Sequence, residues 1–131
     1  MTDTKQKKEK IEKLFKEIMV TMDLPVDEDP SIIKTPYRVA KMFVDEVFSG
    51  LFQERPVITS QPNAFNYDQM LIESNMKVHS FCEHHFVPIL GACHLAYIPK
   101  DKVIGLSKFN RLVDWHSRRP QVQEKLMVRS F

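Results

Sequence analysis

The chain has 131 residues, of which 43% are hydrophobic and 27% charged, with a formal net charge of +2. This length and composition predict one globular domain, or a small domain with an appendage. In either case the chain is long enough to bury a hydrophobic core. So small a net charge is no evidence for nucleic acid, and no apolar run approaches the ~20 residues that span a bilayer. We expect neither a nucleic-acid nor a membrane partner.

Two cysteines and three glycines restrict the possible sites further. Two cysteines do not make a disulfide framework, and the lysine-rich N-terminus does not resemble a secretory signal. We therefore expect a cytoplasmic protein with reduced thiols. Three scattered glycines cannot form a glycine-rich phosphate loop, so any nucleotide must be held in another way.

Residues 1–68 are predicted to form an N-terminal helical region followed by an extended linker. Residues 1–9 are polar and are expected to be frayed. Apolar residues then recur at helical spacing from Ile11 to Met22, which predicts an amphipathic helix. Such a helix suits docking or assembly better than catalysis.

A second helix is predicted to start at Thr35, with Thr35 as N-cap and Pro36 in the first turn, and to end at Gly50. Its inward positions are expected to be Val39, Met42, Phe43 and Val47. Arg38 and Lys41 lie three positions apart on the exposed face. Such a pair is either solvated charge or part of an anion site.

Residues 69–131 are predicted to form the first portion of a catalytic domain, after an extended connection over 51–67. Alternating residues predict a strand over 69–82, and an aliphatic run predicts a second strand over 88–98. Together they predict a β-hairpin. One face of its first strand is expected to carry Met76, Val78 and Ser80.

The predicted hairpin loop carries the segment Cys82-Glu83-His84-His85. A thiolate and an imidazole three residues apart are ligands suited to zinc, so Cys82 and His85 are candidate metal ligands. His84 would remain for proton transfer, and Glu83 could orient an imidazole. A lone Cys-x-x-His pair is a weak signal, which the adjacent histidines strengthen.

Two helices are predicted after the hairpin. Ser107 is expected to cap the first, which runs to His116 and is interrupted by Arg118-Arg119-Pro120. The second is expected to begin at Pro120. The inward residues of the two helices are expected to be Phe109, Leu112, Val113, His116, Val122 and Leu126. A sheet of only two strands is rarely stable alone, which indicates that a part of the fold is missing from the chain.

Five segments in this order resemble the GTP cyclohydrolase I family, over about residues 11 to 127. They are Thr35-Pro36-Tyr37-Arg38-Val39-Ala40-Lys41, Cys82-Glu83-His84-His85-Phe86, Ala96-Tyr97-Ile98-Pro99, Ile104-Gly105-Leu106-Ser107-Lys108 and Arg119-Pro120-Gln121-Val122-Gln123-Glu124. The resemblance implies an α+β tunnelling fold, with an antiparallel sheet that carries helices on one face. It also implies a homodecamer that converts GTP to 7,8-dihydroneopterin triphosphate and formate, with Zn²⁺ as cofactor.

The resemblance assigns a role to each candidate residue. Cys82 and His85 match zinc ligands, and His84 and His85 match the catalytic histidines. Gln123 and Glu124 match the pair that binds guanine, although from the residues alone they would be an exposed helix start. The positions expected to hold the triphosphate are Ser107, Lys108, Arg111, Arg38 and Lys41.

The sequence departs from the family after the last of these segments. Family members continue with two strands that carry a His-x-Cys segment, whose Cys is the third zinc ligand. If residues 83–88 form the hairpin loop, Cys82 faces Ile89, and Cys93 lies ~13 Å away, too far to replace that ligand. We therefore expect a C-terminally truncated form with little turnover unless a second polypeptide supplies the rest.

Two alternatives stand beside this interpretation. The first is a catalytically inactive chain that only associates with full-length subunits. The second is a related tunnelling-fold nitrile reductase, which needs a nucleophilic cysteine and a reduced nicotinamide. Cys82 is flanked by histidines and looks like a ligand, which disfavours the second.

Overall fold

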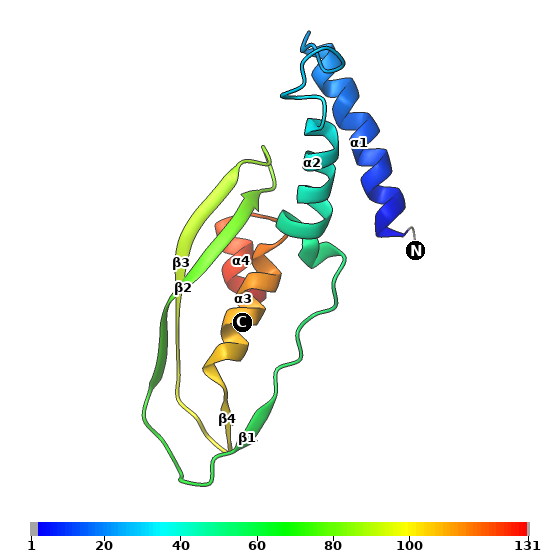
Figure 1. The fold of residues 1–131 in the computed structure, drawn as a ribbon. Helices are drawn as coiled ribbons and strands as arrows, with labels where there is room; N and C mark the ends of the chain where they lie inside the picture. Colours follow the sequence, from blue (N-terminus) through cyan, green and yellow to red (C-terminus); the bar gives the residue numbers. More distant parts are fainter. Residues whose placement is uncertain (1–2, 131) are drawn as a thin grey trace. The chain divides into compact units, whose positions relative to one another are not determined.

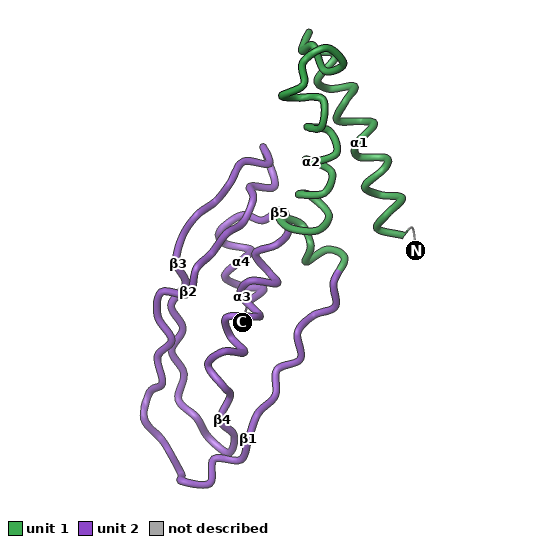
Figure 2. Tube along the Cα trace, in the orientation of Figure 1, with its two compact units in different colours: residues 1–52 green, residues 53–131 purple. Residues whose placement is uncertain are grey.

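A computed structural model describes residues 3–130, which fold as two compact units that divide between residues 52 and 53 (Figure 2). Residues 53–68, which the sequence analysis grouped with the N-terminal helices, thus fall in unit 2. They include strand β1 (Ser60–Pro62), which pairs antiparallel with β4 (Lys102–Ile104). This sheet was not predicted, since three-residue strands carry no readable periodicity. Among the described helices, none combines the length and apolar character needed to cross a membrane.

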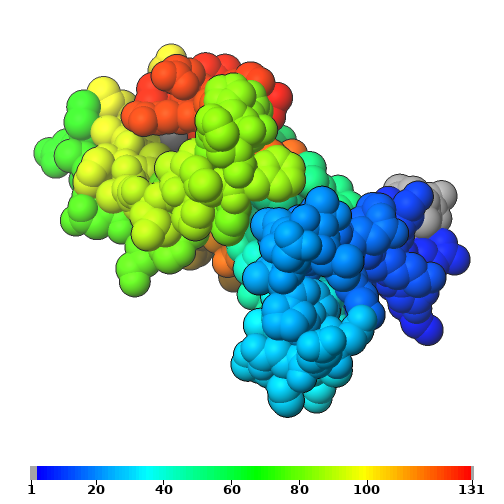
Figure 3. Space-filling model, turned by 90° about the horizontal axis from the view of Figure 1, so that it is seen from above, coloured from blue at the N-terminus to red at the C-terminus, as the bar shows by residue number. Residues whose placement is uncertain are grey.

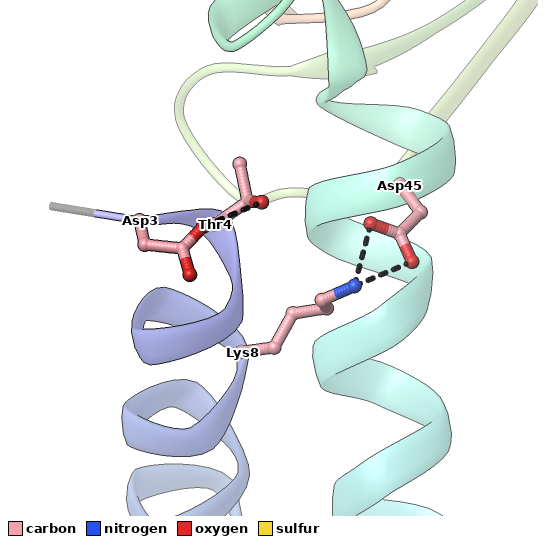
Figure 4. A network of polar contacts seen from close by, with 4 residues as sticks. All are labelled: Asp3, Thr4, Lys8 and Asp45. Carbon is pink, nitrogen blue, oxygen red and sulfur yellow. Dashed lines mark hydrogen bonds and ion pairs between the residues drawn. The ribbon is translucent and has the colours of Figure 1, made fainter.

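Unit 1 begins with helix α1 (Thr4–Thr21), which packs beside α2 (Thr35–Lys41) (Figure 1). The expectation that residues up to 9 are frayed is wrong from Thr4 onward, and the first two residues lie outside the described part. Lysine and glutamate are good helix formers, which extends the helix through this polar stretch. Lys8 Nζ also donates to both carboxylate oxygens of Asp45, at 3.1 and 3.0 Å (Figure 4).

The second helix changes its winding halfway. α2 continues as a π-helix, η1 (Met42–Val47), and a 3₁₀ turn, η2 (Ser49–Leu51). The amide of Phe48 bonds the carbonyl of Phe43 five residues back, at 3.0 Å. The wider turn keeps residues four apart on one face.

The buried face of this helix is shifted by one position from the expected one, already within α2. The buried side chains are Pro36, Ala40, Val44 and Phe48. The expected set (Val39, Met42, Phe43 and Val47) is only half-buried. Thr35 is the first helical residue rather than the cap, which is Lys34.

Unit 2 is built on the predicted hairpin, which is confirmed as β2 (Leu71–Cys82) and β3 (Pro88–Tyr97). A two-residue strand, β5 (Pro120–Gln121), runs parallel to the end of β2, so the strand order is β3-β2-β5. The sequence analysis missed β5 and began the last helix at Pro120. Two residues are too few to reveal a strand, and proline is tolerated at such an edge.

Helices α3 (Leu106–Ser117) and α4 (Gln123–Ser130) lie on the same face of the hairpin (Figure 1). In space-filling view α4 (red) lies against the hairpin (yellow-green) (Figure 3). Gly105, and not Ser107, occupies the N-cap position of α3, and Ser107 makes no capping bond. The core between helices and sheet consists of Met76, Val78, Phe109 and Val113, with Leu126 packed against it.

Candidate functional site

The hairpin loop between β2 and β3 is tightly closed. The amide of Cys82 donates to the carbonyl of Val87 at 2.8 Å, and the amide of Phe86 donates to the carbonyl of Cys82 at 2.9 Å. Phe86 has φ = 53°, a left-handed conformation that is unfavourable for a bulky residue. The loop therefore spans residues 83–86, two residues shorter than expected.

This shorter loop changes the register of the hairpin. Ser80, and not Cys82, is paired with Ile89, and Cys93 is paired with Met76. Cys93 is therefore level with a position six residues before Cys82, or ~20 Å along the strand at ~3.3 Å per residue. The predicted register was wrong, but the conclusion that Cys93 cannot join Cys82 is strengthened.

The loop places a thiol beside two imidazoles. Cys82 is half-buried and not disulfide-bonded, and the backbone amide of His84 lies 3.4 Å from its Sγ. The His84 and His85 rings are exposed, with centroids 6.4 Å apart and planes inclined at 78°. The thiolate is the form of cysteine that binds metals.

Cys82 and His85 are chemically suited to zinc, whose usual protein ligands are thiolates and imidazoles. A catalytic zinc site normally has three protein ligands. Within residues 3–130, however, no three His, Cys, Asp or Glu side chains are grouped closely enough to hold an ion. The donor types therefore fit zinc, while the described residues supply two donors at this loop.

Glu83 contacts a lysine instead of an imidazole. Its Oε1 accepts a hydrogen bond from Lys125 Nζ at 2.6 Å, and this contact lowers the pKa of Glu83. Its backbone amide donates to the carbonyl of Gln121 at 3.0 Å. Sequence reasoning missed Lys125, because a pair 42 positions apart leaves no local pattern.

Gln121 anchors the segment that follows α3. Its side chain is fully buried, with Nε2 donating to the carbonyl of His116 at 2.8 Å and Oε1 accepting from Arg129 Nη1 at 3.3 Å. Gln121 is also paired with Cys82 across β5 and β2. The next residues, Gln123 and Glu124, start α4 and are exposed. The structure thus brings the proposed metal and guanine pairs to the same end of the sheet.

The phosphate candidates lie elsewhere. Ser107, Lys108 and Arg111 are in the first turns of α3, and the neighbouring Asn110 Nδ2 bonds Glu73 Oε1 at 3.0 Å, near the start of β2. Cys82 lies nine positions further along β2, or ~30 Å at ~3.3 Å per residue. The start of α3, with Ser107 and Lys108, therefore lies far from the metal loop. Arg111 lies nearer, because it comes five residues before His116, whose carbonyl bonds the Gln121 side chain opposite Cys82.

The remaining two phosphate candidates belong to unit 1. Arg38 and Lys41 are exposed on α2. Neither side chain is within the sheet-and-helix unit that carries the loop. Their role in binding an anion therefore stays a prediction.

A separate groove of about 560 Å³ lies between β3 and α4. It is lined mainly by apolar side chains, including Leu90, Cys93 and Leu126, and reaches Gln123 at one end. No lysine or arginine lines it, and neither Cys82 nor the two histidines of the loop do so. Its chemistry does not suit a triphosphate.

His116 is a buried histidine whose ring nitrogens have no hydrogen-bond partner among the described residues. Its ring packs edge-on against Trp115, with centroids 4.8 Å apart. Burial, together with the positive charges of Arg119, Arg55 and Arg129, lowers the pKa of His116. The neutral imidazole is therefore favoured in the folded state.

Acid should destabilise unit 2 through this residue. Because the pKa of His116 is lower in the folded than in the unfolded state, the unfolded chain takes up the proton first. His116 therefore does not lower the free energy of unfolding above the ordinary histidine pKa of about 6.5. Below that pH, the free energy of unfolding falls as the pH drops. Urea unfolding of the parent and of His116→Phe at pH 7.5 and pH 5.5 measures this effect. Between the two pH values, the variant should lose less stability than the parent. Equal losses in both proteins would contradict the role of His116.

The comparisons with known proteins agree with the motifs. The family model for GTP cyclohydrolase I matches residues 11–129. The chain is 51% identical over 122 residues to GTP cyclohydrolase 1 of Aeromonas salmonicida (strain A449), covering 92% of this chain and 56% of the relative. Identity is 50% over 125 residues to the Aeromonas hydrophila protein of the same name (95% and 57%), and 48% over 124 residues to that of Flavobacterium johnsoniae (94% and 55%). The chain thus spans little more than half the length of these relatives.

Proposed function

Because the chain belongs to the GTP cyclohydrolase I family, a family of enzymes, we propose that its hairpin loop and α4 form part of a site that opens the guanine ring of GTP. The observation that carries this proposal is the pairing of β2 with β5. It sets Cys82 beside Gln121, two residues before Gln123. The α+β architecture, with helices on one face of an antiparallel hairpin, is consistent with the family's tunnelling fold.

In this proposal the loop residues have separate tasks. Cys82 and His85 hold a zinc ion, which when bound supplies a Lewis acid for opening the imidazole ring of guanine. His84 is exposed at the loop, where an imidazole can exchange a proton with a purine nitrogen. The products are 7,8-dihydroneopterin triphosphate and formate.

Gln123 and Glu124 are proposed to bind the guanine. A carboxylate can accept hydrogen bonds from both N1–H and the exocyclic amine of guanine, whereas adenine offers no such pair of donors. Both side chains are exposed at the start of α4. Ligand is therefore able to reach them without rearrangement of the core.

A second copy of the chain is proposed to supply the phosphate contacts. The first turn of α3, with Ser107 and Lys108, lies near Glu73, nine positions before Cys82 on β2, and so away from the loop in the same chain. A neighbouring subunit can present these side chains, and Arg38 and Lys41, to the loop. We therefore propose a homo-oligomer, a decamer as the resemblance implies, located in the cytoplasm.

Incubation of the purified chain with Zn²⁺ and GTP tests the proposal, with the fluorescence of oxidised pterin as the readout. Turnover is expected to fall at least ~100-fold in Glu124→Gln. The N1–H and exocyclic amine of guanine then meet a side-chain amide instead of a carboxylate that can accept from both. Turnover that the variant retains in full would contradict the assigned role of Glu124.

The alternative proposal is an inactive chain that associates with full-length subunits. It is favoured by the grouping of only two candidate zinc donors at the loop within the described residues. In that case the chain alone gives no pterin, yet co-purifies with a co-expressed full-length relative such as the Aeromonas hydrophila protein. Turnover by the chain alone would reject this alternative.

A further inference from the structure

The ion pair between Glu83 and Lys125 joins the two parts of the proposed site. Lys125 Nζ lies 2.6 Å from Glu83 Oε1, although the residues are 42 positions apart in sequence. Glu83 directly follows Cys82 in the loop, whereas Lys125 directly follows Glu124 on α4. The pair therefore connects the loop with the metal donors to the turn with the guanine-binding residues.

The position of Lys125 is not explained by the stability of α4 itself. Lys125 lies in the first turn of the helix, where the macrodipole disfavours a positive charge. Within the same turn, Glu124 is the acidic residue that the dipole favours. Glu83 provides a contact outside the helix that offsets this unfavourable position.

The backbone already fixes the base of the loop. The amide of Glu83 donates to the carbonyl of Gln121, whose own side chain is buried and bonded to His116. The body of α4 is held by Leu126, which packs against the core, and by Arg129, which bonds Gln121. The Glu83–Lys125 pair adds a contact between the first turn of α4 and the loop itself.

We propose that Lys125 is a positioning residue which, through Glu83, sets the spacing between the metal-binding loop and the guanine-binding turn of α4. This inference rests on the proposed function for the roles of the two parts. The side chains of Lys125 and Glu83 are 50% and 26% exposed, so the pair contributes modestly to stability. Its consequence is geometric, and its loss should loosen the loop without unfolding unit 2.

Alkylation of Cys82 in the full chain tests the positioning directly, without metal. Lys125→Met is expected to raise the rate of Cys82 alkylation by iodoacetamide about three-fold, the size of change that loss of an exposed pair allows. A faster reaction reports a more accessible Cys82 thiol, and therefore a looser loop. Lys125→Arg should restore the parental rate. Mass spectrometry of both cysteines makes Cys93 the internal reference.

A matched control removes an ion pair of the same length in unit 1. Lys16 Nζ lies 2.6 Å from Asp27 Oδ1, and Lys16→Met should leave Cys82 alkylation unchanged. An unchanged Cys82 rate in Lys125→Met, an equal rise at Cys93, or the same rise in Lys16→Met would overturn the positioning role.

Titration with Co²⁺, followed by its visible absorbance, gives the second readout. Lys125→Met should weaken Co²⁺ binding about three-fold, and Lys125→Arg should bind like the parent. If the parent itself binds no Co²⁺, the proposed metal site fails, while the alkylation rates still decide the role of Lys125. If Co²⁺ binds equally to the parent and Lys125→Met, the positioning role is overturned and the metal site stands.

Discussion

Replacement of Gln121 by alanine is expected to destabilise unit 2 by about 3 kcal/mol. The Gln121 side chain is fully buried, and truncation leaves a cavity as well as a buried carbonyl at His116 without its donor. It also removes the acceptor of Arg129 Nη1, which can turn to solvent at little cost. Urea unfolding followed by the fluorescence of Trp115, the only tryptophan in the sequence, reports on unit 2.

Gln123→Ala provides the matched control. Gln123 has the same chemistry two positions along the chain but is exposed, and its truncation should change stability by less than about 0.5 kcal/mol. Equal midpoints for Gln121→Ala and Gln123→Ala would show that burial of Gln121 does not anchor β5.

Replacement of Cys82 by serine is expected to weaken Zn²⁺ and Co²⁺ binding at least ~100-fold. Changes around metal ligands already cost 10–100-fold, and loss of the thiolate itself removes a donor that zinc prefers. Competition between the chain and a chromophoric chelator measures the Zn²⁺ affinity. The Co²⁺ complex should also lose its sulfur-to-metal absorbance band.

The second cysteine gives the comparison for this experiment. Cys93 is paired with Met76, six residues before Cys82 on β2, and so lies away from the loop. Cys93→Ser should therefore bind Zn²⁺ and Co²⁺ like the parent. Weaker binding by Cys93→Ser than by Cys82→Ser would place the metal elsewhere and reject the assignment of the loop.

Elements with a long periodic pattern could be predicted from the sequence. Alternation over 69–82 indicated β2, and helical spacing indicated that Phe109, Leu112, Val113 and His116 face inward on α3, as they do. Both patterns arise because one face of each element packs into the same core.

Features that depend on distant partners could not be predicted in this way. β5 is two residues long and exists because β2 offers an edge to it. The hairpin register depends on the length of a loop, which a left-handed Phe86 closes after four residues. The π-helical winding of 42–47 was likewise not predictable, and the buried face of the second helix lies one position from the expected one.

The candidate site shows the same division. The types and spacing of Cys82 and His85 predicted a metal site, and the family motifs supplied Gln123 and Glu124 as the proposed guanine-binding pair. The contact of Glu83 with Lys125 was not predictable, because the two residues meet only after α4 folds onto the end of the sheet.

The backbone of Phe86 bears on how the loop would take up a ligand. Holding a bulky residue with φ near 53° costs of order 1 kcal/mol or more, which the surrounding structure must offset. The shape of the loop is thus set before any ion or nucleotide arrives. Association then requires little further loss of backbone entropy in the loop, which is the thermodynamic meaning of preorganisation.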